Sequence, residues 1–188
     1  MIRIRASSLP AVSECPSSLL LHKDAPTHVA GERALLGSDV HSLIAEYLRT
    51  GVEPVFRFPQ DEERAYLFRS WYTIWAVGDP VNKVAPLMSY FLGAEMVIEQ
   101  EMEWQSSISY SGGALLSGHA DLLGFRGDDL FICDWKTGYV DHRFTAQELG
   151  YAFLALKMFP EKKWKRCYIM TVWVRDGFVD VNDGIKPY

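Results

Sequence analysis

The sequence contains few cysteines and no long apolar segment. Its three cysteines, Cys15, Cys133 and Cys167, show no CxxC spacing, and an odd count with Cys133 inside an apolar strand pattern indicates reduced thiols. No stretch approaches the roughly 18 apolar residues of a membrane span, and the N-terminus lacks the long apolar segment of a signal peptide. We therefore expect a cytoplasmic protein without a membrane partner.

A surplus of basic residues, an internal repeat and a low-complexity tract are also missing. The formal net charge is −5, so the chain as a whole does not attract nucleic acid. An acidic protein can still bind DNA where a metal ion and a local basic patch meet the phosphates. The hydrophobic fraction of 48% allows a sizeable core, and the 188 residues fit one domain, residues 1–188.

The first part of this domain, residues 1–93, is expected to be mainly helical. A capped start predicts a short helix over residues 9–13. Apolar residues with helical spacing predict a helix that begins at residues 37–41 and ends at Thr50-Gly51. Further helices are predicted over about 60–77 and over 81–92.

From Ala94 onwards, the apolar pattern changes to a period of two. Alternation over residues 97–104 predicts a strand, and an amphipathic helix is predicted over 145–159. Strands over 164–174 and 178–181 follow, joined at an Asp-Gly hairpin signal. With the hairpin described next, this order predicts an α/β (α+β) fold in which residues 94–188 form a mixed central sheet flanked by helices.

Two apolar strand patterns lead into Asp121 and Asp134, with a turn around Gly127 between them. A hairpin of these strands would bring both carboxylates and Lys136 to one end of the sheet. Two carboxylates at one point repel each other unless a cation lies between them. Hard oxygen ligands suit Mg²⁺ or Mn²⁺.

This arrangement predicts metal-assisted hydrolysis of a phosphodiester. Lys136 points to the same side of its strand as Asp134 and could orient or activate a water molecule. The carbonyl of Trp135 could be a further metal ligand. The structural alternative is a salt-bridged strand end, formed by Asp134 and Lys136 alone.

The sequence resembles the PD-(D/E)XK nuclease superfamily, specifically its RecB-like branch, which includes the CRISPR-associated RecB-type and phage exonucleases. The resemblance rests on motifs in the family's order, and it covers most of the chain. These motifs are SxL at residues 7–9 followed by Cys15-Pro16, GxxxH at 37–41, GxxD at 118–121, D-W-K-T-G at 134–138 and QxxxY at 147–151. Each motif alone is weak, but their succession at family-like separations is specific.

The resemblance implies a restriction-endonuclease-like core with an N-terminal helical region and a site that holds Mg²⁺ or Mn²⁺. It implies that Asp121, Asp134 and Lys136 are the catalytic residues and that the metal ligands are His41, Asp121, Asp134 and Trp135. Gln147 and Tyr151, one helical turn apart, would face the site and the DNA backbone.

Two further residues near the motifs have open assignments. Glu99 matches an acidic residue of the strand that precedes GxxD, and Glu101 lies on the same face of that strand. Glu99 is a candidate contact of the metal or its waters, and either glutamate could instead be solvated. We expect His119 to point away from Asp121 and to be structural.

The resemblance implies a metal-dependent deoxyribonuclease that acts as an exonuclease in DNA recombination, repair or phage DNA metabolism. Its partner would be DNA, with any helicase or recombination motor on a separate protein, and it would act in the cytoplasm or, if phage-encoded, in the host cytoplasm. One alternative is a catalytically silent module that binds DNA or a protein, and another is a nuclease acting on RNA. Some relatives hold an iron–sulfur cluster with three late cysteines, but no cysteine follows Cys167, so no cluster is expected.

A basic cluster after the predicted 145–159 helix has two interpretations. Its members are Lys162, Lys163, Lys165 and Arg166. Such a cluster is either a phosphate-contacting patch or a solvated face.

Overall fold

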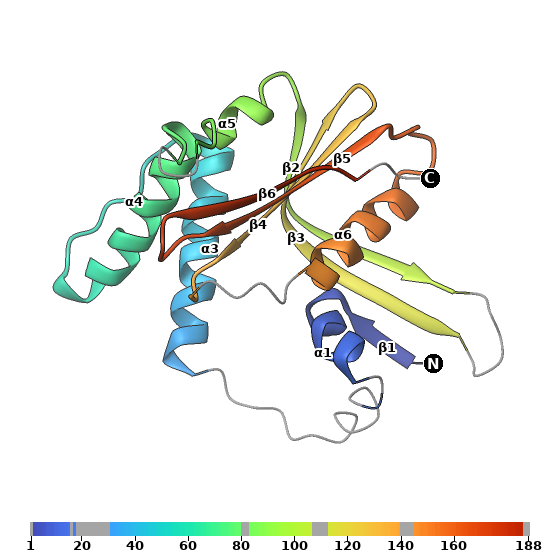
Figure 1. Ribbon diagram of the computed structural model, residues 1–188. Helices are drawn as coiled ribbons and strands as arrows, with labels where there is room; N and C mark the ends of the chain where they lie inside the picture. The colour runs from blue at the N-terminus through green and yellow to red at the C-terminus, as the bar shows by residue number, and fades with distance from the viewer. Residues whose placement is uncertain are drawn as a thin grey trace.

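The computed structural model describes residues 2–15, 17, 31–79, 83–106, 113–139 and 145–185. A mixed β-sheet lies at its centre, with helices on both faces (Figure 1). The strands are β1 (Ile2–Arg5), β2 (Glu95–Gln105), β3 (Ala114–Arg126), β4 (Asp129–Lys136), β5 (Arg166–Trp173) and β6 (Phe178–Ile185). The helices are α1 (Leu9–Glu14), α3 (Glu32–Thr50), α4 (Glu62–Ala76), α5 (Leu87–Tyr90) and α6 (Thr145–Met158), with 3-10 turns η1 (Ala6–Ser8) and η2 (Pro59–Asp61). The fold class predicted from the sequence is confirmed.

The order of strands in the sheet is β1-β3-β4-β5-β6, and β2 pairs with the other edge of β3. The pairs β2–β3, β3–β4 and β5–β6 are antiparallel, whereas β1–β3 and β4–β5 are parallel. A parallel pair needs a crossover connection, and α6 lies in the connection from β4 to β5.

Strand β3 changes its partner along one edge, and this change creates an opening in the sheet. β1 pairs with β3 as far as Ser117, and β4 pairs with β3 from Leu122 onwards. Residues 118–121 therefore pair with neither strand on this edge. The GxxD motif occupies this segment.

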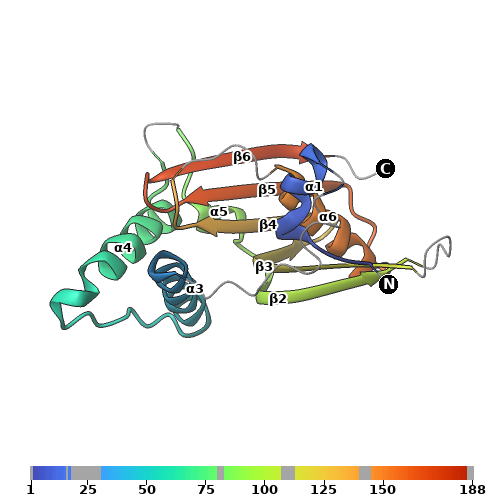
Figure 2. The same cartoon turned by 90° about the horizontal axis from the view of Figure 1, so that it is seen from below.

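Helices cover both faces of the sheet. Successive strand residues point to opposite sides, so each strand contributes side chains to both cores. Leu122 of β3 and Cys133 of β4 pack in a core with α3, α4 and α5. Leu123 and Ile132, their neighbours in the chain, pack in a second core with α6. Figure 2 shows α3 and α4 together on one side of the molecule and α6 with α1 on the other.

Three differences from the sequence-based expectation concern residues 1–93. β1 was not predicted, although it pairs with β3 beside the opening. Helix α3 begins at Glu32, before the predicted start. The predicted helix over 81–92 is wrong, because Asp79 and Val84 form a β-bridge and only α5 is helical in the described part of that segment, which excludes 80–82. Pro16 also lies outside the described residues.

Candidate active site

The opening beside β3 is a cleft of about 540 Å³. Its lining comes from β1, η1, α3, β2, β3, β4 and α6. The lining includes six of the predicted site residues, namely His41, Asp121, Asp134, Lys136, Gln147 and Tyr151. The motifs that are far apart in the chain therefore meet at one place.

Asp121 is almost completely buried and makes two contacts at the head of the cleft. Its Oδ2 accepts a hydrogen bond from the backbone N–H of Trp135 at 2.8 Å. Its Oδ1 lies 3.0 Å from Nδ1 of His41. The first contact replaces the strand pairing that β3 and β4 lose beyond Leu122, so the carboxylate holds the two strands together where they separate.

His41 reaches Asp121 from α3. Helices α3 and α6 cover opposite faces of the sheet. Partial burial disfavours the imidazolium, but the charge and hydrogen bond of Asp121 raise the pKa of His41 above its ordinary value. The ring also contacts Trp135 edge to face, with centroids 6.3 Å apart. Trp135 itself is fully buried.

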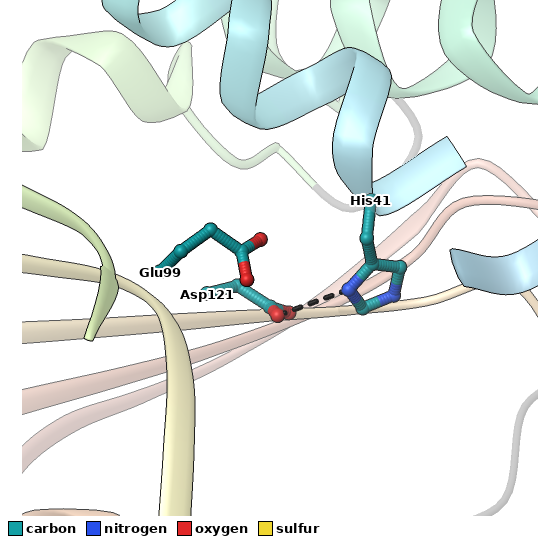
Figure 3. Close-up of side chains that lie close together, drawn as sticks. All are labelled: His41, Glu99 and Asp121. Carbon is teal, nitrogen blue, oxygen red and sulfur yellow. Dashed lines mark hydrogen bonds and ion pairs between the residues drawn. The ribbon is translucent and has the colours of Figure 1, made fainter. Parts of the chain in front are cut away.

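His41, Glu99 and Asp121 form a cluster that could hold a metal ion. One ligand atom from each residue lies within 4.8 Å of the others. Figure 3 shows the carboxylates of Glu99 and Asp121 and the ring of His41 gathered at one point. Burial and the charge of Asp121 raise the pKa of Glu99, as expected for adjacent carboxylates without a cation.

Glu99 has a backbone conformation that is unusual for a residue with a side chain. Its φ is +57°, and it lies opposite Asp121 at the point where the pairing of β2 with β3 is interrupted. Such strain is common at functional sites. The Oε1 atom of Glu99 is buried and has no hydrogen-bond partner among the described residues, which fits a cation ligand.

His119 holds the other oxygen of Glu99. Its Nε2 lies 3.1 Å from Oε2 of Glu99, and the His119 side chain lines the cleft. The expectation that His119 points away from Asp121 is wrong. Residues two apart on a strand share a face, so the parity of 119 and 121 already placed both side chains on the same side.

Asp134 and Lys136 form an ion pair in the cleft. Nζ of Lys136 lies 2.5 Å from Oδ2 of Asp134. Burial and the charge of Asp121 raise the pKa of Asp134 to about 6, although Lys136 opposes this shift. The roles of Asp134 and of the Trp135 carbonyl as metal ligands remain predictions, because Trp135 contacts the cluster residues through its N–H and its ring, and the cluster itself consists of His41, Glu99 and Asp121.

Gln147 and Tyr151 lie on the cleft face of α6. Nε2 of Gln147 donates to the hydroxyl of Tyr151 at 2.6 Å, and both side chains are buried. A Cβ at Gly118 would lie 2.9 Å from the Tyr151 ring. The glycine of GxxD therefore makes room for the tyrosine of QxxxY.

The glycine of the GxxxH motif has a similar explanation. A Cβ at Gly37 would lie 2.9 Å from Oγ1 of Thr137 in the D-W-K-T-G segment. Helix α3 can therefore approach the end of β4 closely enough for His41 to reach Asp121.

The basic cluster of residues 162–166 lies far from this cleft. Arg166 pairs in register with Asp129 at the start of β4, whereas Lys136 is at its end, about 23 Å away at the usual strand rise. Lys165 and Arg166 form ion pairs with Asp128 and Asp129. These positions fit a solvated face better than a contact with a phosphate bound in the cleft.

The fold and the cleft define an α+β protein with a candidate divalent-metal site at the point where a mixed sheet opens. Comparison with known proteins is consistent with this class. The family model of the PD-(D/E)XK nuclease superfamily matches residues 3–171, and the chain belongs to this superfamily. Membership implies a metal-dependent nuclease, and nucleases of this superfamily use divalent metal ions.

The solved structure described as "Crystal structure of SSO0001" superposes with a TM-score of 0.46 at 13% sequence identity, over 100% of this chain and 69% of that chain. No curated protein matches this chain. Within the described residues, no helix has the length and apolar character needed to cross a membrane.

Proposed function

We propose that this protein is a Mg²⁺- or Mn²⁺-dependent deoxyribonuclease that hydrolyses phosphodiester bonds at the cleft beside β3. The observation that carries the proposal is the close approach of His41, Glu99 and Asp121, with Lys136 in the cleft that His41 and Asp121 also line. A divalent cation held there would act as a Lewis acid on the phosphodiester and make a water molecule more acidic.

The residues of the metal cluster and of the two motifs that line the cleft have distinct tasks in this proposal. Asp121 and His41 hold the cation, and Glu99 supplies the buried oxygen that otherwise has no partner among the described residues. Asp134 holds the ammonium group of Lys136, which donates to the attacking water or to a phosphate oxygen. Gln147 and Tyr151 line the opposite wall, where their polar groups bind the DNA backbone.

The order of the motifs supports a more specific proposal for the branch of the superfamily and the kind of nuclease. The complete succession from GxxxH to QxxxY supports the RecB-like branch, and this branch favours an exonuclease in recombination, repair or phage DNA metabolism. A motor or recombination partner would be a separate protein, and the reduced cysteines favour a cytoplasmic location. The organisation as one domain over residues 1–188 is part of the same proposal.

Cleavage assays test this function directly. The purified protein is incubated with end-labelled linear, circular and single-stranded DNA, and with RNA, in Mg²⁺ and in Mn²⁺. We expect cleavage of linear DNA, and a loss of about 100-fold or more in Lys136→Ala, as for removal of a positioned proton donor or acceptor. Lys163→Ala is the matched control, because this lysine is exposed and far from the cleft.

The outcomes separate the proposal from its alternatives. Cleavage of the circle would replace exonuclease by endonuclease action, and cleavage of RNA alone would change the substrate. No cleavage in either metal, or equal cleavage by wild type and Lys136→Ala, would contradict the nuclease. Calorimetric titration with Mn²⁺ then identifies a silent module, for which binding is absent or insensitive to Asp121→Ala.

A further inference from the structure

A second depression, about 290 Å³ in volume, adjoins the cleft at the end of β4. It shares His41 and Lys136 with the cleft. Its other lining residues are Trp135, Thr137, Gly138, Tyr139 and Trp173. Aromatic rings therefore surround a hollow that begins at the lysine of the candidate active site.

Tyr139 is the exposed ring of this hollow, with 69% of its surface accessible, whereas Trp135 and Trp173 are buried. One side of the Tyr139 ring faces Arg175, whose guanidinium carbon lies 5.6 Å from the ring centroid. Cation–π contacts of this kind hold an aromatic ring in place. Among the described residues, which exclude 140–144, most of the surface of Tyr139 stays exposed, and this surface is where a flat ligand would stack.

The support of the ring is itself fixed. Nη2 of Arg175 lies 2.6 Å from Oε1 of Glu63, and its Nε donates to the carbonyl of Thr137 at 3.3 Å. The backbone N–H of Val174 donates to the carbonyl of Lys136 at 2.9 Å. The turn between β5 and β6 therefore fastens the segment that carries both Lys136 and Tyr139.

Exposure alone would not single out Tyr139, because Phe58 and Tyr66 are also more than half exposed. These two rings line a different cavity, beside α4, which contains none of the cleft residues. Tyr139 differs from them because its hollow adjoins the cleft, with His41 and Lys136 lining both. A ligand whose phosphate lies at Lys136 would therefore place its neighbouring group over the ring.

We propose that Tyr139, supported by Arg175, is a stacking platform for a nucleobase of single-stranded nucleic acid next to the phosphate bound in the cleft. The proposal rests on the nuclease function argued above and adds a base-binding subsite to it. Every base has a π-face, so stacking on an aromatic side chain tolerates any sequence. The platform thus selects an unpaired base and leaves the choice of base open.

A double-mutant cycle between the ring and the base tests the platform. Cleavage of a single-stranded oligonucleotide is compared with that of the same oligonucleotide with an abasic nucleotide next to the scissile phosphate. We expect Tyr139→Ala to raise KM for the intact substrate about 10-fold, in line with a stacked base. On the abasic substrate it should have no effect, and Tyr139→Phe should behave as wild type. Phe58→Ala is the control for loss of an exposed ring.

The outcomes also distinguish this inference from the proposed function. If the wild type cleaves both substrates and Tyr139→Ala lowers cleavage of both equally, or of neither, the platform is wrong and the nuclease stands. If the wild type cleaves neither these oligonucleotides nor the DNA and RNA substrates named above, the nuclease is wrong. Whenever the oligonucleotides are not cleaved, binding of a 2-aminopurine oligonucleotide gives the separate readout. Fluorescence quenching that Tyr139→Ala abolishes would then support the platform, and absent quenching would overturn it.

Discussion

The backbone N–H of Trp135 donates to Oδ2 of Asp121 at 2.8 Å, at the place where β3 and β4 stop pairing. The other oxygen of the same carboxylate lies 3.0 Å from Nδ1 of His41. The Asp121 side chain therefore connects β3 with β4 and α3, and it is also a member of the candidate metal cluster. Asp121 therefore contributes both to folding stability and to the metal site, and two different substitutions can distinguish these contributions.

Asp121→Ala should lose both properties, whereas Asp121→Asn should lose mainly metal binding. Alanine leaves the buried N–H of Trp135 without an acceptor, which costs about 1–3 kcal/mol of unfolding free energy. Asparagine keeps an acceptor oxygen but removes the charge. Urea unfolding of the metal-free protein and calorimetric titration with Mn²⁺ measure the two effects. Equal stability of Asp121→Ala and wild type would contradict the bridging role, and Asp128→Ala is the exposed control.

Gly118→Ala should destabilise the protein through the wall of the cleft. The added Cβ would lie 2.9 Å from both Tyr151 and Leu154, and these side chains are buried in the core beneath α6. Overpacking of this kind costs about 1–3 kcal/mol. Gly138→Ala is the matched control, because a Cβ added at Gly138 would meet nothing within 4 Å among the described residues. Equal urea midpoints for the two variants would show that α6 can move away without cost.

Strand and helix periodicity correctly predicted the elements in which apolar residues of the local sequence line one face. The apolar runs before Asp121 and Asp134 predicted β3 and β4, and the glycines of the motifs have direct reasons in close contacts. The family motifs then predicted that His41 would meet Asp121. This prediction needed the resemblance, because no local rule relates α3 to β3.

The features that the sequence did not predict depend on tertiary structure. β1 is a short strand that gains its hydrogen bonds from β3, far along the chain. The bridge between Asp79 and Val84 overrides the helical pattern of residues 81–92. The positive φ of Glu99 brings its carboxylate into the cluster, and nothing in the spacing of 99, 101 and 103 distinguishes this position.

Asp134 should make the stability of the metal-free protein depend on pH. Burial and Asp121 raise its pKa from 3.8 to about 6, so the folded state binds the proton more tightly than the unfolded state. The stability from this proton is complete below the unfolded pKa and is lost as the pH rises through 6. The loss should be about 1–3 kcal/mol.

The comparison with Asp134→Asn isolates this effect. Urea unfolding from pH 4 to pH 7 in a chelator should show a weaker decline in Asp134→Asn than in wild type. Mn²⁺ should reduce the decline of the wild type, because a cation favours the ionised carboxylate. Parallel pH profiles of the two proteins would contradict the raised pKa.

His119 should control metal affinity by positioning Glu99. Its Nε2 lies 3.1 Å from Oε2 of Glu99, while the Oε1 atom has no partner among the described residues. His119→Leu removes the donor and should weaken Mn²⁺ binding about 10-fold or more, the range for partners of metal ligands. His119→Gln restores an N–H donor and should recover most of the affinity. The histidine side chain is 46% exposed, so both variants should unfold at the urea concentration of wild type. Calorimetry gives the affinities, and equal Mn²⁺ binding by His119→Leu and wild type would show that the strained backbone alone positions Glu99.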